Sequence, residues 1–344
     1  MERGSTSVGV LVIGAGAIAD QHVAALSGDP RGRLAGFVDT SAARAERAAR
    51  AQGGVPWTTD LAEALAWPGV DACVLCTPND THDELAVRIA AAGKHLLVEK
   101  PLATTVPAAR KTVESFAAAG RALSVAHSHR FYDYARTIRR EIDSGALGRP
   151  LLVRLALLGG WIWPDWRTWI IDRDRSGGHA LHNGVHLLDL VTWWIGDEPV
   201  SVYARGQRRT AAELDVHDHL EMVVTYAGGA TAICEMSRAH RPASLSARDV
   251  VVQGTEGLLT MEWDGEGVLL ADERGTHLAA EGPAAGFAAQ LSAWLDAITG
   301  NPATAAAGGG AGVAGDEALL AVAMGVAAER SMELGRPVRL EEVR

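Results

Sequence analysis

The stretch Val8-Gly-Val-Leu-Val-Ile-Gly-Ala-Gly-Ala-Ile-Ala19 decides the fold. Its first part, Val8–Ile13, is an unbroken apolar run, which is typical of a strand buried on both faces of a parallel sheet. The chain then turns at Gly14 and Gly16 and enters an expected helix, Ile18–Leu26. A buried strand that passes through a glycine turn directly into a helix predicts the first unit of a parallel α/β domain.

The first third of the chain repeats this alternation of strand and helix. Further buried strands are expected at Leu34–Val38, Ala72–Cys76, His95–Val98 and Ala122–Val125, and helices at Ser41–Gln52, Leu61–Ala66, Asp80–Ala92 and Val106–Ala119. Apolar strands separated by helices indicate a parallel sheet that is covered on both faces. We therefore expect residues 1–126 to form a doubly wound Rossmann domain.

From residue 127 onwards the pattern changes. After a helix at Arg136–Ser144, strands alternate polar and apolar residues or meet through tight turns, which predicts a large, mostly antiparallel sheet with one open face. The helix Leu187–Ile195 is expected on the other face, Pro302–Gly315 as a loop, and Glu317–Leu334 as a last helix that could pack back on the first domain. Residues 127–344 are thus predicted to be an α+β domain for substrate binding and oligomerisation. The expected strands are Leu152–Leu158, Val200–Gln207, Glu221–Tyr226, Ala230–Ser237, Ala247–Gly254, Leu258–Trp263 and Val268–Asp272.

The composition excludes several classes of protein. With 344 residues, the chain is longer than a domain with a single hydrophobic core usually is. Its net charge of −10 would repel nucleic acid. No apolar run reaches the roughly 18 residues of a membrane span. The start, Met1–Ser7, lacks the basic and apolar regions of a signal peptide. We expect a soluble, cytoplasmic protein, and its abundant arginine and alanine with scarce lysine indicate a GC-rich bacterial genome.

The sequence gives only weak indications of a metal site. Cys73 and Cys76 form a C-x-x-C within an expected strand, where residues three apart point to opposite faces. Two histidine pairs lack a carboxylate or thiolate cluster at ligand spacing. These pairs are His127 with His129 and His217 with His219. We predict no metal site.

The glycine turn fits the G-x-G-x-x-G/A pattern of dinucleotide-binding domains, with Ala19 in the third place. A helix that begins there presents free N–H groups to a pyrophosphate. Asp39, at the end of the second strand, can accept both ribose hydroxyls and would repel a 2′-phosphate, so NAD is expected rather than NADP. Arg44 either pairs with a 2′-phosphate or lies on the solvated face of its helix. The expected cofactor-binding residues here are Gly14, Gly16, Ala17, Ile18 and Asp39.

Three further motifs carry a resemblance to a known family. Thr77-Pro78-Asn79 followed by His82, Glu99-Lys100-Pro101, and the segment Gly177–Asp189 resemble the T-P-x-x-x-H, E-K-P and glycine-rich G-x-H-x-x-D motifs of the Gfo/Idh/MocA oxidoreductases. The resemblance implies a Rossmann domain followed by a substrate domain, and a dehydrogenase or reductase acting on CH–OH groups. It adds Thr77, Pro78, Asn79, His82, Glu99 and Lys100 to the expected cofactor site.

The resemblance also implies the catalytic groups. Lys100 corresponds to the family's lysine that hydrogen-bonds the reacting oxygen, and His186 to its general acid/base, a task that suits a near-neutral pKa. Asp189 either orients the His186 imidazole or merely caps and packs. The chain departs from the family where His182 replaces the usual aspartate, and we expect His182 or its neighbour Asn183 to orient the substrate. A second departure is His179 in place of the third glycine.

A tryptophan-rich stretch precedes the last motif. Tryptophan faces stack on sugar rings and attract cations, so we expect Trp163, Trp166 and Trp169 to line the substrate site. A packed loop or an oligomer interface is the alternative. Arg130 is expected to reach the cofactor or the substrate.

The function predicted from these features is NAD-dependent hydride transfer to or from a ring hydroxyl or ketone of a sugar, cyclitol or glycoside. The acidic chain and its tryptophans favour a bulky glycoside or an aminosugar-bearing product. Two alternatives stay open: glycoside cleavage by redox cycling, and a non-catalytic dinucleotide sensor. The expected partners are a carbohydrate-like small molecule and further copies of the chain in a dimer or tetramer, with no nucleic acid and no membrane.

Overall fold

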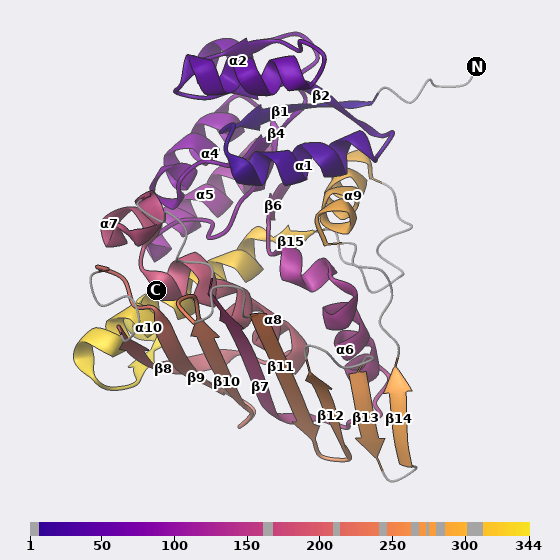
Figure 1. Ribbon diagram of the computed structural model, residues 1–344, viewed down its shortest axis with the longest axis vertical. Helices are drawn as coiled ribbons and strands as arrows, with labels where there is room; N and C mark the ends of the chain where they lie inside the picture. The colour runs from indigo at the N-terminus through magenta and orange to yellow at the C-terminus, as the bar shows by residue number, and fades with distance from the viewer. Residues whose placement is uncertain are drawn as a thin grey trace. The chain divides into compact units, whose positions relative to one another are not determined.

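The computed structural model of the chain describes residues 7–160, 168–208, 214–240, 246–262, 268–272, 275–279, 286–300 and 312–344 (Figure 1). The chain divides into two compact units. Unit 1 consists of Met1–Ala103, Pro107–Ser128 and Ala285–Leu319, and unit 2 of Thr104–Val106, His129–Ala284 and Leu320–Arg344. The first long break, after Ser128, lies near the expected boundary, but a late segment returns to unit 1. The functions assigned to the two parts stay predictions.

Unit 1 contains a seven-stranded sheet in the order β15-β6-β5-β4-β1-β2-β3. Every neighbouring pair is parallel except β15 with β6. The doubly wound Rossmann sheet expected from the sequence is therefore confirmed. Its strands are β1 (Val8–Ile13), β2 (Gly32–Val38), β3 (Trp57–Thr58), β4 (Ala72–Leu75), β5 (His95–Val98), β6 (Leu123–Val125) and β15 (Val313–Ala314).

The sequence missed β3 and β15, because two residues are too few to show a pattern. Since β15 lies inside Pro302–Gly315, the expected loop is wrong at that end, and its residues 302–311 lie outside the described part of the chain. The final helix begins at Gly315, earlier than expected.

Six helices of the described chain accompany this sheet, and α1 lies beside α9, which comes from the returning segment (Figure 1). Arg31, just before β2, ties the turn that follows α1 to α9. Its guanidinium donates to Asp29 and Asp296, and at 2.6 Å to the Ser292 hydroxyl. The helices are α1 (Ala17–Ser27), α2 (Ala42–Ala51), α3 (Leu61–Leu65), α4 (His82–Ala91), α5 (Val106–Ala119) and α9 (Gly286–Thr299).

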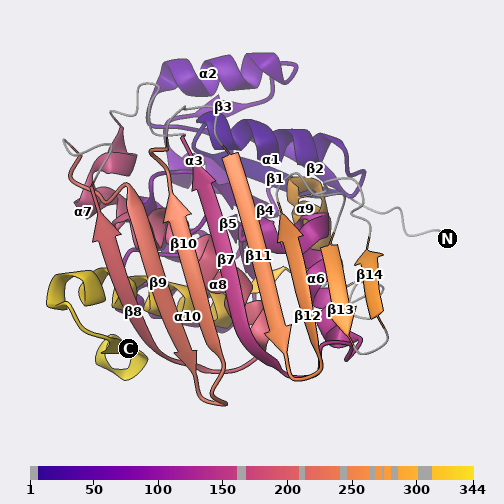
Figure 2. The same ribbon diagram turned by 60° about the horizontal axis from the view of Figure 1, so that its bottom comes forward.

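Unit 2 contains a nine-stranded sheet in the order β14-β13-β12-β11-β7-β10-β9-β8-β16 (Figure 2). Only β7 and β10 run parallel; the other neighbours are antiparallel, so the expected mostly antiparallel sheet is confirmed. Its strands are β7 (Pro150–Gly159), β8 (Pro199–Gln207), β9 (His219–Tyr226), β10 (Thr231–Ser237), β11 (Ser246–Gly254), β12 (Gly257–Glu262), β13 (Val268–Asp272), β14 (Gly275–Ala279) and β16 (Val338–Arg339).

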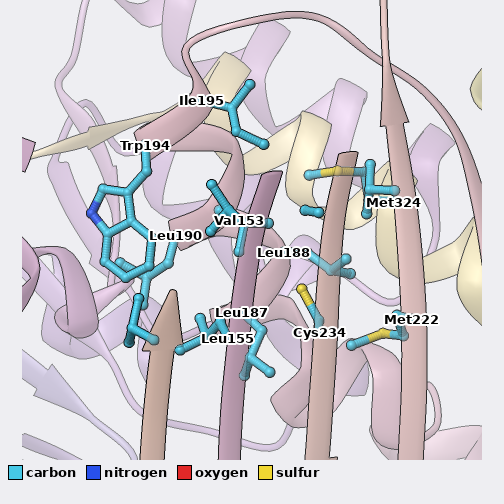
Figure 3. Packing of buried hydrophobic residues seen from close by; sticks show 14 of the residues in the cluster. Val153, Leu155, Leu187, Leu188, Leu190, Trp194, Ile195, Met222, Cys234 and Met324 are labelled. Atoms are coloured by element: carbon cyan, nitrogen blue, oxygen red, sulfur yellow. The ribbon is translucent and has the colours of Figure 1, made fainter. Parts of the chain in front are cut away.

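One face of this sheet carries the core of unit 2. The helix α8 (Val185–Ile195) packs against β7 and β10, as expected, and Figure 3 shows its leucines and Trp194 facing Val153 and Leu155 of β7. Trp194 is fully buried, and its Nε1 donates to the Ala135 carbonyl oxygen at 3.1 Å. The remaining helices of this unit are α6 (Asp133–Asp143), α7 (Arg173–Ser176) and most of α10 (Gly315–Leu334).

The opposite face of the sheet is open in the isolated chain. Alternate strand positions there expose large apolar side chains, 37–41% accessible, whereas their neighbours along the strands are buried in the core. These exposed residues are Tyr203, Ile233, Leu258 and Leu269.

Two features of the described residues bear on other classes of protein. None of the helices described is long and apolar enough to cross a membrane. Among the same residues, no three histidine, cysteine, aspartate or glutamate side chains gather closely enough to hold a metal ion. Cys73 and Cys76 are free and buried, and burial raises the pKa of the Cys73 thiol to about 12.

Two tryptophans of the described chain, Trp194 and Trp294, are fully buried and offer a matched stability test. Trp194→Phe removes the donor to Ala135 and leaves that carbonyl with one bond fewer, so we expect a loss of about 1–3 kcal/mol in the free energy of unfolding beyond the loss of ring volume. Trp294→Phe is the control, because the Trp294 Nε1 makes no hydrogen bond within the described structure. Calorimetry of both variants measures the difference, and equal losses would contradict the prediction.

Candidate functional site

The glycine turn of unit 1 joins three strands. Gly14 has φ +90°, its N–H donates to the Val38 carbonyl at 2.7 Å, and a Cβ at this position would lie 2.6 Å from the Cys76 carbonyl oxygen. A side chain here would therefore collide with rigid backbone. Glycine is required at this position both by its φ and by this close approach.

Gly16 serves a different purpose. No atom lies within 4 Å of the Cβ that another residue would place there, and in the described structure no side chain caps α1 at this end. The unsatisfied N–H groups and the positive end of the helix dipole thus face open space. Ala17 and Ile18 are both exposed on this first turn. This arrangement fits the pyrophosphate of a dinucleotide, as the sequence predicted.

Asp39 follows β2 and is held rigidly. Its carboxylate accepts from the Ala15 N–H at 2.9 Å, from the Ser41 N–H at 2.7 Å and from the Arg44 Nη2 at 2.7 Å. Burial raises the pKa of Asp39, but the hydrogen bonds from Arg44, Ser41 and Ala15 outweigh burial and hold the pKa below its ordinary value. Arg44 is exposed on its helix, as one of its two expected roles has it, and its guanidinium is bound to Asp39.

The loop after β4 carries Thr77, Pro78 and Asn79. His82, which begins α4, is fully buried, with Nδ1 2.7 Å from the Pro101 carbonyl oxygen and Nε2 2.9 Å from that of Thr77. Burial lowers the pKa of His82. A ring with no accessible surface thus holds the two motif loops together, and the expected contact of His82 with the cofactor stays a prediction.

Glu99 likewise has partners within unit 1. Its Oε1 lies 2.8 Å from His22 Nε2, and its Oε2 accepts from the Lys100 N–H at 3.3 Å. Burial raises the pKa of Glu99, but the His22 hydrogen bond and the charges of His22 and Lys100 lower it below its usual value. Because His22 lies on α1, the turn that carries Lys100 is tied to the glycine-turn helix. The Glu99 carboxylate thus bridges to α1, and its expected contact with the dinucleotide stays a prediction.

Sequence reasoning missed His22, although a signal was present. His22 lies on the same helix face as Ala19, Val23 and Leu26, all of which are buried. A polar side chain in an apolar helical stripe requires a buried partner. Glu99, a carboxylate directly after a strand, was a candidate for this partner.

Unit 2 contains the histidine-bearing segment. After α7, Gly177 and Gly178 both have positive φ, and a π-helical turn, Ala180–Gly184, leads into α8. His182 and Asn183 lie on this turn and are buried, while His186 lies partly exposed on the first turn of α8. π-Helical turns occur frequently at functional sites, because they change which side chains a helix presents.

Aromatic contacts surround these histidines. The His186 ring lies 4.6 Å from the ring of His129, whose Nδ1 is 2.9 Å from the Tyr134 hydroxyl. Trp169 lies edge-on to His182, with 5.2 Å between ring centroids. The other two predicted tryptophans, Trp163 and Trp166, lie outside the described residues.

Two further side chains near this segment were not predicted in these roles. Arg238, buried at the end of β10, donates from Nε to the Asn183 amide oxygen at 3.0 Å when that amide is oriented to satisfy both partners. Burial lowers the pKa of Arg238 to about 9. Burial, together with the Arg238 charge, also lowers the pKa of His179 well below normal, so this imidazole is neutral near pH 7.

Arg130 and Asp189 form a buried bidentate pair. Arg130 donates from Nε and Nη2 to the two Asp189 oxygens at 2.8 and 2.7 Å, and its guanidinium lies over the Trp193 ring. The guanidinium fork of Arg130 is aligned with the Asp189 carboxylate, and a contact of Arg130 with cofactor or substrate stays a prediction. Asp189 fixes α8 through this pair, and the orientation of the His186 imidazole by Asp189 stays a prediction.

The Asp39–Arg44 pair predicts cofactor preference. A 2′-phosphate beside the Asp39 carboxylate is repelled, so NAD should bind at least about tenfold more tightly than NADP. Asp39→Ser removes the repulsion and releases Arg44, which should narrow or reverse this ratio. Fluorescence titration with NAD and NADP measures the ratio of their affinities. Glu46→Ser, on the same helix as Arg44, is the control. Equal affinities for NAD and NADP in the unmodified chain would contradict the predicted preference for NAD.

Comparison with known proteins places this geometry in a family. Residues 8–127 match the profile of the oxidoreductase family with an NAD-binding Rossmann fold, and residues 135–260 match the GFO/IDH/MocA C-terminal domain. An inositol 2-dehydrogenase from Rhizobium meliloti is 31% identical over 73% of this chain and 74% of its own length. A 1,5-anhydro-D-fructose reductase from Ensifer adhaerens is 28% identical over 96% of this chain and 98% of its own length.

A solved structure extends the likeness to the whole chain. GenD2 from gentamicin A biosynthesis, in complex with NAD, has a TM-score of 0.82 and 30% sequence identity, and the match covers 98% of this chain and 99% of GenD2. Both family domains are thus present in their usual order. The chain belongs to the Gfo/Idh/MocA family of NAD-binding oxidoreductases.

Proposed function

We propose that the chain transfers hydride between NAD and a ring hydroxyl or ketone of a sugar, cyclitol or glycoside. The observation that carries this proposal is the tie between the cofactor helix and the E-K-P turn. The His22–Glu99 hydrogen bond joins α1, whose open N-terminus fits a dinucleotide, to the residue that precedes Lys100. A cationic side chain held beside a dinucleotide site suits the stabilisation of an alkoxide.

Each of the two catalytic side chains has a distinct task in this proposal. When bound, NAD supplies the hydride acceptor or donor. His186 takes the proton from the substrate hydroxyl, or returns it in the reductive direction, and the Lys100 ammonium donates a hydrogen bond to the reacting oxygen. His182 and Asn183 orient the substrate, and the face of Trp169 packs against its ring, with Trp163 and Trp166 as further predicted contacts.

For the substrate, we favour a glycoside that carries an aminosugar. Three observations support this choice: the likeness to GenD2 from gentamicin A biosynthesis, the tryptophan-rich stretch before the motif, and the net charge of −10. The relatives named for inositol and anhydrofructose indicate the wider class of cyclic polyols and sugars.

We also propose that the chain forms a homo-oligomer through its large sheet. The apolar side chains of Tyr203, Ile233, Leu258 and Leu269 are exposed on the open face, and such patches favour association. The dimer or tetramer and the cytoplasmic location stay predictions.

Substitution of the two catalytic residues tests the mechanism. Lys100→Ala and His186→Ala should each lower kcat by about 10²-fold or more, because each removes an interaction with the reacting oxygen or its proton. The Kd for NAD should change little. Lys111→Ala, which removes an exposed lysine of α5, is the control for Lys100. Near-normal turnover in either variant would show that the role assigned to that residue is wrong.

A substrate panel tests the reaction itself. We expect NADH to form with glycosides or cyclitols, and kcat/KM to be highest for aminoglycosides and to fall as salt screens the acidic surface. A preference for free glucose or inositol would defeat the aminosugar assignment. Glycoside cleavage without net NADH would favour redox cycling, and NAD binding without turnover of any compound would favour a sensor.

A further inference from the structure

A buried carboxylate from the C-terminal helix reaches the histidine-bearing segment. Glu329 lies on α10, within unit 2, and is only 8% accessible. Its Oε1 accepts from the Ala180 backbone N–H at 2.8 Å, across 149 residues of sequence. Ala180 begins the π-helical turn that carries His182 and leads to His186. The first N–H groups of a helical segment have no acceptor within that segment, and the Glu329 carboxylate supplies one for the Ala180 N–H.

The same carboxylate explains the second glycine of the motif. A Cβ at Gly178 would lie 2.4 Å from the Glu329 carboxyl carbon and from its Oε1, and the φ of Gly178 is +88°. At Gly177, where φ is +78°, the nearest atom is the end of the Leu181 side chain, at 2.9 Å. Gly178 is thus required by its backbone conformation, and the Glu329 carboxylate occupies the place that a Cβ would take.

The charged groups around Glu329 come from two helices. Arg173 of α7 lies 3.7 Å from Oε2, and Glu333, one turn further along α10, binds the same guanidinium. Burial raises the pKa of Glu329 to about 7, although the Ala180 N–H and the Arg173 charge act to lower it, while the charge of Glu333 adds to the rise. Burial of the Glu329 carboxyl group costs free energy of folding, and its hydrogen bond with the Ala180 N–H offsets this cost.

We propose that Glu329 is a positioning residue that fixes the start of the segment Ala180–Ile195 and thereby the orientation of His182 and His186. The inference rests on the proposed function only for the catalytic role of His186. The hydrogen bond to Ala180 and the fit against Gly178 carry it independently of any substrate.

Two substitutions at Glu329 separate positioning from mere bulk. Glu329→Gln keeps an oxygen that can accept from Ala180 and should retain kcat within about threefold. Glu329→Leu has no acceptor and should lower kcat by about ten- to a hundredfold, since small displacements of a catalytic group are costly, with the Kd for NAD within about twofold. Glu333→Gln, which changes the neighbouring carboxylate, is the matched control. Glu329→Ser serves the same purpose should the Leu variant not fold.

Hydrogen exchange reads the structural step without turnover. In mass spectrometry of the peptide spanning residues 176–186, amides of the Leu variant should exchange faster, and those of the Gln variant should match the unmodified chain. Unchanged exchange and unchanged kcat in Glu329→Leu would overturn the proposal. If His186→Ala stays active while exchange follows this pattern, the proposed function fails and the positioning contact stands.

The pH dependence of stability gives a further readout. A carboxyl group whose pKa is higher in the folded chain than in the unfolded chain stabilises the fold most below its unfolded pKa of about 4.3. That stability is lost as pH rises through about 7. The Tm of the unmodified chain should therefore fall more steeply between pH 5 and 8 than the Tm of Glu329→Gln. Parallel Tm profiles would contradict a buried, titrating Glu329.

Discussion

The close approach of backbone at Gly14 is the constraint on which unit 1 depends. The residue after β1 accepts no side chain, because the carbonyl oxygen after β4 occupies the place of its Cβ, and its N–H is bound to the last residue of β2. Three parallel strands are thereby brought to one edge. Ligands bind at the carboxyl ends of such strands. The open N-terminus of α1, the carboxylate of Asp39 and the loops that carry Thr77 and Lys100 all follow from that edge.

Much of this arrangement could be predicted from the sequence. The strands of the first sheet are continuous apolar runs, and helices such as α5 (Val106–Ala119) have clear start and stop signals in the sequence. Their bounds could therefore be predicted almost to the residue. The strands β3 and β15 were not found, because two-residue strands exist only through their neighbours. In unit 2 the alternation of buried and exposed residues indicated the antiparallel sheet, but the parallel pairing of β7 with β10 leaves no mark on either strand.

The site was predicted less completely, for a physical reason. Motifs identify the residues that matter, but they do not say which group each side chain contacts. His82 and Glu99 belong to recognisable motifs, yet their side chains bind the protein itself, and Arg130 binds Asp189. Their partners lie far away in sequence, so only the folded chain shows them. His22, Arg238 and Glu329 were missed for the same reason.

The two units fix their motif backbones with the same chemistry. In unit 1, Asp39 accepts from the Ala15 N–H within the glycine turn, and Glu99 accepts from the N–H of Lys100. In unit 2, Glu329 accepts from the Ala180 N–H at the start of the histidine segment. A carboxylate is suited to this task, because it accepts several hydrogen bonds and binds N–H groups more strongly than a neutral oxygen does. Burial strengthens the contact further. Rigid backbone at these three points therefore fixes where the Lys100 side chain and the histidine-bearing segment begin.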